Sequence, residues 1–227
     1  MASLITERFD YKKLKRCDLP EGRRYVTPDG EALPSVTTIL SATGDKSHLE
    51  QWRKRVGREK AQQITQEAAG VGSRMHNYLE KYILEGEWQT PGSNPYAQQA
   101  NKMAERIRDE ALIHLNEIWG SEVPLYYPGI YAGTTDLVGV YKDKPAIMDF
   151  KQSNRPKKTE WVDDYRLQLV SYILCHNEVY DTDINEGHIF MCSRDFTYQH
   201  FSVEPCEFDY WVNEWWERVY KFYENLG

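Results

Sequence analysis

The stretch GTTDLVGVYKDKPAIMDFKQ, residues 133–152, contains two apolar segments joined by a polar turn. Apolar side chains lie on both faces of each predicted strand, a pattern typical of paired strands that are covered on both sides. Three charged residues, Asp136, Asp149 and Lys151, interrupt this pattern. If the connecting loop has an even number of residues, the two-residue period of a strand places all three side chains on one face, whereas a three-residue loop separates them. We expect the even loop, and therefore a cluster of charges within an otherwise apolar sheet.

Two carboxylates and an ammonium group in this arrangement are typical of a metal site for phosphodiester hydrolysis. Neighbouring buried carboxylates repel each other and resist ionisation, and a divalent cation between them removes that cost. Such a cation polarises phosphate and generates hydroxide, while Lys151 orients water or stabilises developing negative charge. A D-x-K triplet alone favours another interpretation, an ion pair at a strand end with Asp136 as a turn cap. The carboxylate of Asp136 on the adjoining strand favours the metal site.

Composition and charge point to a protein with a local basic groove. The chain has 227 residues, enough for one large domain, and no apolar run long enough to predict a membrane span. The first residues lack an apolar secretory core and the four cysteines form no C-x-x-C pair, so we expect a reducing cytoplasm. The net charge of −7 argues against a nucleic-acid partner, but Lys and Arg cluster in YKKLKRC, GRRY, QWRKRVGREK and KQSNRPKK. These clusters predict a basic groove, although part of WRKRVGREK also fits a solvated helix face.

The predicted elements run from a helical N-terminal region into a meander of strands. A hairpin is predicted at 24–34 around PDG, and Ser47 with Glu50 predicts a capping box at the start of the first helix. Gly86 and Gly120 are expected to end the second and third helices. The order of elements predicts an α/β protein with a central mixed β-sheet flanked by helices. The predicted helices cover 48–66, 67–86, 95–119, 161–180 and 207–225, and the predicted strands cover 122–127, 131–141, 145–151, 187–192 and 197–203.

Several further residues are ordinary when each is taken alone. A lone His76 on a helix is usually a satisfied polar residue or a cap, Glu122 fits a strand-end charge, and Gln168 and Tyr172 share a helix face, as many pairs do. Together, in the order His76, Glu122, GTTD, IMDFK and QLVSY, they resemble the PD-(D/E)xK nuclease superfamily, and within it the RecB-like exonuclease branch. The upstream segment LPSVTTIL…LEQWRKRVG is similar to the mitochondrial genome maintenance exonuclease family. The resemblance covers roughly 25–180.

This resemblance implies a restriction-endonuclease-like core and a role for each motif residue. Lys151 would act on the attacking water or the scissile phosphate, and Glu122 would assist a second metal or a water. The residues that would hold Mg²⁺ or Mn²⁺ are His76, Asp136, Asp149 and the backbone carbonyl of Phe150. Those that would orient Lys151 or the substrate phosphate are Gln168 and Tyr172. Those that would contact DNA phosphates are Ser35, Thr37 and Thr38, and those expected to grip phosphate beyond the DFK motif are Arg155, Lys157 and Lys158.

The expected function is a metal-dependent DNA exonuclease that acts on single strands or free ends. One nuclease domain would cover 1–227, with a helical arch or lid at about 45–120 and the catalytic sheet core at about 121–205. The alternatives are a structure-specific or restriction-type endonuclease, which would be expected to dimerise, and a catalytically silent nucleic-acid-binding module on the same fold. No iron–sulfur cluster is expected, because Cys175, Cys192 and Cys206 lack the tight grouping of cluster ligands. The expected location is the cytoplasm of a bacterium or a phage-infected cell, and the short chain favours phage.

Overall fold

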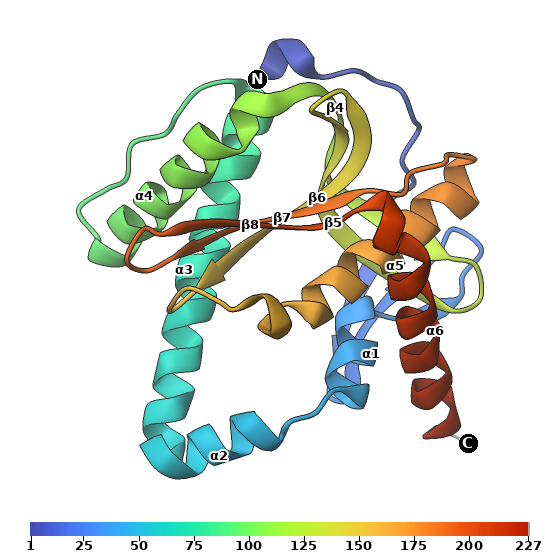
Figure 1. Ribbon diagram of the computed structural model, residues 1–227, viewed down its shortest axis with the longest axis horizontal. Helices are drawn as coiled ribbons and strands as arrows, with labels where there is room; N and C mark the ends of the chain where they lie inside the picture. The colour runs from blue at the N-terminus through green and yellow to red at the C-terminus, as the bar shows by residue number, and fades with distance from the viewer. Residues whose placement is uncertain (227) are drawn as a thin grey trace.

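The computed structural model describes residues 1–226, apart from the side chain of Ala2. Its central sheet has the strand order β4, β5, β6, β7 and β8. Neighbouring strands are antiparallel except β6 and β7, which are parallel and are joined through helix α5. This mixed sheet between helices confirms the expected fold class (Figure 1). The strands are β4 (Leu115–Tyr127), β5 (Tyr131–Tyr141), β6 (Lys144–Ser153), β7 (Gly187–Ser193) and β8 (Tyr198–Val203).

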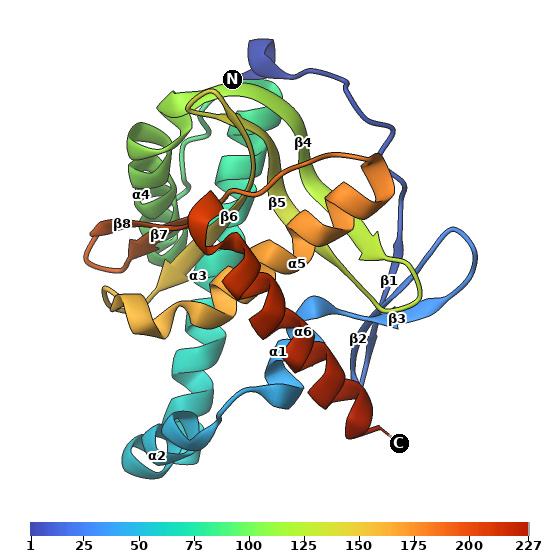
Figure 2. The same cartoon turned by 45° about the vertical axis from the view of Figure 1, so that its right-hand side comes forward.

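Two layers of helices cover the sheet (Figures 1 and 2). Helices α3 (Arg58–Glu85) and α4 (Pro95–Glu110) pack on one face, and α1 (Val36–Thr43), α5 (Asp163–Tyr180) and α6 (Phe208–Glu224) pack on the other. Because α5 lies between the sheet and α6, its apolar residues are buried almost all round. No helix within residues 1–226 is long and apolar enough to cross a membrane. Short 3₁₀ turns cover Ala2–Leu4, Leu112–His114, Thr159–Trp161 and Pro205–Glu207.

The β5–β6 hairpin has the predicted even loop. Leu137 pairs with Met148, and Tyr141 pairs with Lys144, so two residues connect the strands. Both loop residues, which are Lys142 and Asp143, have positive φ values of 47° and 66°, as a tight two-residue hairpin turn requires. The register of this strand pair could therefore be predicted from the sequence alone.

A second, three-stranded sheet precedes the helices and lies beside α1 (Figure 2). It consists of β1 (Lys15–Leu19), β2 (Gly22–Val26) and β3 (Ala32–Pro34). The antiparallel β2–β3 hairpin confirms the prediction around PDG. Strand β1 was not predicted, because its residues are almost all exposed and show no apolar alternation. A single bridge between Ser35 and Ala132 links the end of this sheet to β5.

The helices around Gly57 differ from the prediction. One helix was expected over 48–66, but α2 (Ser47–Val56) ends before Gly57, and α3 begins at Arg58 and runs through the second predicted helix without a break. Gly57 separates the two helices with a φ of 86°, which glycine adopts without steric cost. None of the residues of α2 is buried, and the helix lies at the foot of α3, away from the sheet (Figure 1).

The predicted capping box at the start of α2 is wrong. The hydroxyl of Ser47 donates a 2.9 Å hydrogen bond to the carboxylate of Asp45, which also accepts the backbone N–H of Ser47 at 2.8 Å. The N-cap is Lys46, whose side chain makes no capping hydrogen bond. Asp45 therefore stabilises the turn that leads into the helix, as short acidic side chains commonly do.

The third predicted helix, over 95–119, is too long. Helix α4 ends at Glu110, and the chain passes through a 3₁₀ turn into β4. In that strand Ile118 and Trp119 are buried, and Gly120, expected to end a helix, pairs with Val138 of β5. Pairing with a distant strand decides the conformation here, and a local sequence pattern does not reveal that pairing. The sheet core therefore begins earlier than the predicted boundary near 121.

Candidate metal and catalytic site

The central sheet splits where the two predicted carboxylates lie. Strands β5 and β6 pair only as far as Leu137 and Met148, beyond which β5 pairs with β4 and β6 pairs with β7. The next residue beyond this pair is Asp136 on β5 and Asp149 on β6. The backbone N–H of Phe150 donates a 2.6 Å hydrogen bond to Oδ2 of Asp136, so a side chain accepts a donor that faces the gap between the strands. We call this separation of β5 from β6 the fork. It places polar side chains between two strands that are held apart by their pairing with β4 and β7.

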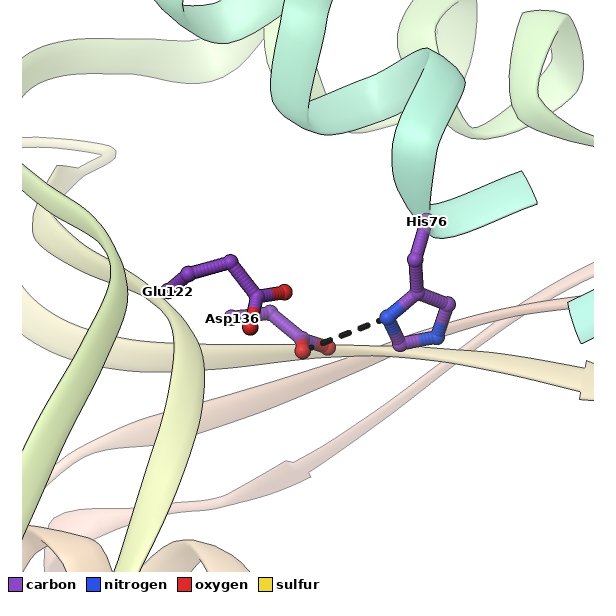
Figure 3. Close-up of side chains that lie close together, drawn as sticks. All are labelled: His76, Glu122 and Asp136. Carbon is purple, nitrogen blue, oxygen red and sulfur yellow. Dashed lines mark ion pairs between the residues drawn. The ribbon is translucent and has the colours of Figure 1, made fainter. Parts of the chain in front are cut away.

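His76, Glu122 and Asp136 converge at this fork (Figure 3). One ligand atom from each residue lies within 4.8 Å of the other two, and Nδ1 of His76 is 3.3 Å from Oδ1 of Asp136. His76 comes from the middle of α3, whereas Glu122 comes from β4 and lies at the exposed edge of the group. Glu122 has a φ of 51°, a left-handed conformation that strains a non-glycine residue and is found preferentially at functional sites. An imidazole and two carboxylates in this arrangement can hold a divalent metal ion.

Asp149 and Lys151 form a buried ion pair near this group. The side chain of Asp149 is 4% exposed and that of Lys151 is 17% exposed. The ammonium group of Lys151 lies against Oδ2 of Asp149 and 5.1 Å from the centre of the Tyr165 ring. Despite this contact, Oδ2 of Asp149 is buried without a hydrogen bond of acceptable geometry among the described residues. The cation at this oxygen is therefore the ammonium group of Lys151.

Crowding of these groups shifts their pKa values. Burial would lower the pKa of His76, but the carboxylate of Asp136 outweighs burial and raises that pKa to about 9. Burial and the charge of Asp136 together raise the pKa of Glu122 to about 7. Burial raises the pKa of Asp149 to about 6, although the ammonium group of Lys151 acts in the opposite direction. Near neutral pH the imidazole of His76 therefore keeps its proton, and a metal ion must displace that proton in order to bind there.

Gln168 and Tyr172 share a face of α5 and contact each other. Nε2 of Gln168 donates a 3.1 Å hydrogen bond to the hydroxyl of Tyr172, and both side chains are buried. The Tyr172 ring packs on Gly133 of β5, where a Cβ atom would lie 2.5 Å from a ring carbon. The ammonium group of Lys151 faces Tyr165, which lies on α5 one turn before Gln168. Orientation of Lys151 by Gln168 and Tyr172 therefore stays a prediction, and Tyr165 is a site residue that the sequence reasoning missed.

Ser35, Thr37 and Thr38 stand at the start of α1, and the hydroxyls of all three make hydrogen bonds within the protein, that of Thr37 with the Ser35 hydroxyl at 2.9 Å. The hydroxyl of Ser35 accepts the backbone N–H of Thr38 at 3.0 Å and caps the helix, and Ser35 is only 2% exposed. The hydroxyl of Thr38 donates to the carbonyl oxygen of Arg23 at 3.1 Å. The structure explains Ser35 as a helix cap, whereas Thr37 is exposed. The phosphate contacts proposed for this segment stay predictions.

The basic residues beyond the DFK motif lie on the segment that follows β6. Arg155 and Lys157 line a cleft of about 530 Å³, which is also lined by Gln152, the neighbour of Lys151 in β6. Lys158 is exposed, and its ammonium group lies 5.3 Å from the centre of the Trp161 ring. Their predicted contact with phosphate is untested, but the structure places two of the three in one cleft.

Fold and site together define a mixed α/β protein in which a His–Glu–Asp group able to hold a metal ion lies near a buried Asp–Lys pair. The chain is similar to the mitochondrial genome maintenance exonuclease family, which confirms the resemblance predicted from its motifs. It is 26% identical over 240 residues to mitochondrial genome maintenance exonuclease 1 of Xenopus tropicalis, an alignment that covers 97% of this chain and 65% of that protein. The proteins of the same name from Mus musculus and Homo sapiens are 26% and 25% identical, and each alignment covers 85% of this chain.

The chain spans 58% to 65% of the length of these curated relatives. No family model matches it. One solved crystal structure aligns with 42% of this chain and 47% of its own at 13% identity, with a TM-score of 0.29, a likeness too low to carry an argument. The names of the relatives refer to mitochondria, and the expected bacterial or phage-infected cytoplasm stays a prediction.

Proposed function

We propose that this protein is a metal-dependent deoxyribonuclease that removes nucleotides from free DNA ends, with a preference for single strands. The observation that carries the proposal is the convergence of His76, Glu122 and Asp136 beside the buried pair of Asp149 and Lys151. Metal ligands next to a lysine are the groups that phosphodiester hydrolysis needs. The names of the curated relatives favour an exonuclease over an endonuclease.

The side chains at the fork fit a divalent cation. Their donors are hard carboxylate oxygens and one imidazole nitrogen, a set that suits Mg²⁺ or Mn²⁺, with the imidazole favouring Mn²⁺. When bound, the cation would polarise the scissile phosphate and increase the acidity of a water molecule. The burial of the Asp149 carboxylate near that of Asp136 supports its inclusion as a ligand, and it would then share its charge between the metal and the Lys151 ammonium group. The proposed ligands are His76, Asp136, Asp149 and the carbonyl oxygen of Phe150, with Glu122 assisting a second metal or a water.

Lys151 would act as a charge and not as a base. Burial would lower the pKa of its ammonium group, but the carboxylates of Asp149 and Asp136 outweigh burial and raise that pKa. The ammonium group therefore stays protonated at neutral pH, where it can donate hydrogen bonds to water or to phosphate oxygen. Charge held in a site with little water stabilises a transition state more strongly than charge in solution does. Gln168 and Tyr172 are proposed to support this geometry from α5.

The single nuclease domain would include a lid over the site. Helix α2 and the first turns of α3 extend away from the sheet, and within the described residues α2 packs mainly on α3 (Figure 1). A helix with no buried residue contributes little to the core, so a role in covering substrate is consistent with its position. Helix α4 and the rest of α3 pack on the sheet, so the lid expected at about 45–120 is proposed here for α2 and the first turns of α3 alone. We also propose that Thr37 with Arg155, Lys157 and Lys158 contacts DNA phosphates.

The proposed activity is tested with end-labelled linear single-stranded and double-stranded DNA in Mg²⁺, Mn²⁺ or EDTA. We expect stepwise loss of nucleotides from single strands with either cation and none in EDTA. A circular single-stranded DNA should stay intact, because it has no end. Cleavage of the circle would identify an endonuclease instead, and binding without cleavage of any substrate would identify a silent nucleic-acid-binding module.

A further inference from the structure

A cleft of about 530 Å³ separates the α2–α3 pair from the segment that follows β6. Its wall combines aromatic rings with cationic side chains, which is the composition of sites that bind unpaired nucleotides. Trp161 is the most exposed of these rings, at 57%. The aromatic residues of the wall are Trp52, Trp161 and Tyr165, and the cationic residues are Arg55, Arg155 and Lys157.

The segment that carries much of this wall is held in place by side-chain hydrogen bonds to its backbone. Gln199 of β8 accepts the N–H of Lys157 at 2.7 Å and donates to its carbonyl oxygen at 2.8 Å. Arg166 of α5 donates to the carbonyl oxygen of Thr159 at 3.0 Å. The backbone of the segment between β6 and α5 is therefore fixed at two points, and this backbone needs little ordering when a ligand binds.

The positive charge of the cleft is not neutralised by the protein. Within residues 1–226, no carboxylate oxygen lies within 4.0 Å of a charged nitrogen of Arg55, Arg155 or Lys157. Two carboxylates at the start of α5 have other partners, since Asp163 pairs with Arg166 at 2.9 Å and Asp164 pairs with Arg218 at 3.1 Å. A polyanion that enters the cleft would therefore meet cations that are free to bind it.

The cleft leads directly to the catalytic lysine. Tyr165 lines the cleft, and its ring centre lies 5.1 Å from the ammonium nitrogen of Lys151. Gln152, which follows Lys151 in β6, lines the same cleft. A strand whose phosphate lies at Lys151 would therefore meet this cleft at the Tyr165 ring.

We propose that this cleft is a subsite for the unpaired nucleotides next to the scissile phosphate, with one base stacked on Trp161. Arg55, Arg155 and Lys157 bind the phosphates of that segment. The proposal rests on the proposed nuclease function and adds to it the place where the single strand is held. It also explains a large aromatic ring that is left exposed beside a basic surface.

The test is a binding cycle that combines a side-chain deletion with a base deletion. The affinity of a fluorescent single-stranded oligonucleotide is measured in Ca²⁺ for the wild type and for Trp161→Ala, with an abasic nucleotide placed at each position in turn. Loss of one stacked base lowers affinity by roughly five- to hundred-fold. We expect Trp161→Ala to lose affinity on this scale, and one abasic position to weaken the wild type but to have no further effect in the variant. Additive effects at every position, or unchanged affinity of Trp161→Ala, would overturn the proposal.

Matched variants separate stacking from charge and from general damage. Trp161→Phe should retain much of the affinity, since a smaller ring still stacks. Tyr220→Ala removes an exposed ring of α6, 63% exposed, and should bind as the wild type does. Arg155→Ala should weaken all oligonucleotides alike and reduce the salt dependence by about one ion, whereas replacement of the exposed Lys102 of α4 by alanine should not.

Failure of this inference is distinguishable from failure of the nuclease proposal. Cleavage by the wild type in Mn²⁺ is measured alongside binding. A wild type that cleaves while Trp161→Ala binds normally contradicts the subsite alone. A wild type that never cleaves contradicts the nuclease proposal, and the binding cycle still decides whether the cleft holds a base.

Discussion

The backbone N–H of Phe150 donates a 2.6 Å hydrogen bond to Oδ2 of Asp136, at the point where strands β5 and β6 stop pairing. The other carboxylate oxygen of Asp136 lies 3.3 Å from Nδ1 of His76. One oxygen of the Asp136 carboxylate thus accepts a backbone donor of β6, and the other oxygen faces the proposed metal site. Substitution of Asp136 would disturb both fold and chemistry, so Asp149 is the better carboxylate to test.

Asp149→Asn should abolish cleavage and weaken Mn²⁺ binding while the protein stays folded. Asparagine keeps the shape of the side chain but removes the anionic oxygen, and the Asp136 carboxylate remains to balance the Lys151 ammonium group. Isothermal calorimetry with Mn²⁺ measures the affinity, and circular dichroism checks the fold. Undiminished Mn²⁺ affinity in this variant would remove Asp149 from the ligand set.

His76→Ala should lower activity mainly by loosening the metal. An excess of Mn²⁺ should then restore part of the rate, because the carboxylate ligands remain. The measurement is the cleavage rate as a function of Mn²⁺ concentration, in both the wild type and the variant. An equal rate for the two proteins at limiting Mn²⁺ would make His76 an ordinary polar residue of α3.

His76 should also give metal-free protein a specific dependence of stability on pH. Its pKa is raised from 6.5 to about 9 in the folded protein, so its stabilising effect is complete below pH 6.5 and is lost as pH rises towards 9. Comparison with His76→Asn cancels the contributions of titratable groups outside the site. In EDTA, the thermal midpoint of the wild type should fall relative to that of His76→Asn between pH 6.5 and 9. A constant difference across this range would show that the imidazole has no such charged partner.

Gly133→Ala should destabilise the protein through Tyr172. The added methyl group would lie 2.5 Å from a ring carbon of Tyr172, so the ring and its hydrogen bond with Gln168 must shift. Overpacking of this kind costs about 1–3 kcal/mol. Urea denaturation measures the loss, and Gly92→Ala, where no atom lies within 4 Å of the new methyl group, is the matched control. Equal stability of Gly133→Ala and the wild type would contradict the tight packing of Tyr172.

Elements that depend on neighbouring residues could be predicted from the sequence, whereas elements that depend on contacts with distant segments could not. The β5–β6 hairpin was predictable because alternation and a two-residue turn are properties of neighbouring residues. The first half of β4 was predicted as helix, because its pairing with β5 includes two irregular steps, between Leu115 and Glu117 and between Ile118 and Gly120. Such register shifts break the alternation by which a strand is recognised.

The residues of the candidate site also divide into those that the sequence predicted and those that only the structure revealed. The motif order pointed to His76, Glu122 and Asp136, and the structure brings these residues together. Tyr165 and Trp161 were missed, because nothing in their local sequence shows that α2 and α3 lie opposite them across a cleft. A residue whose role depends on a surface formed by distant segments becomes visible only in the folded protein.

Lys151→Ala tests the central claim most directly, because it separates chemistry from binding. If the ammonium group acts on the attacking water or on transition-state charge, its loss removes an interaction made mainly in the transition state. Single-turnover cleavage at saturating DNA should then fall by roughly 10²–10³-fold or more, while DNA affinity in Ca²⁺ changes little. Arg155→Ala is the internal control and should weaken binding but keep the saturated rate. A Lys151→Ala variant that keeps its saturated rate while losing DNA affinity would contradict the account and favour a silent DNA-binding module.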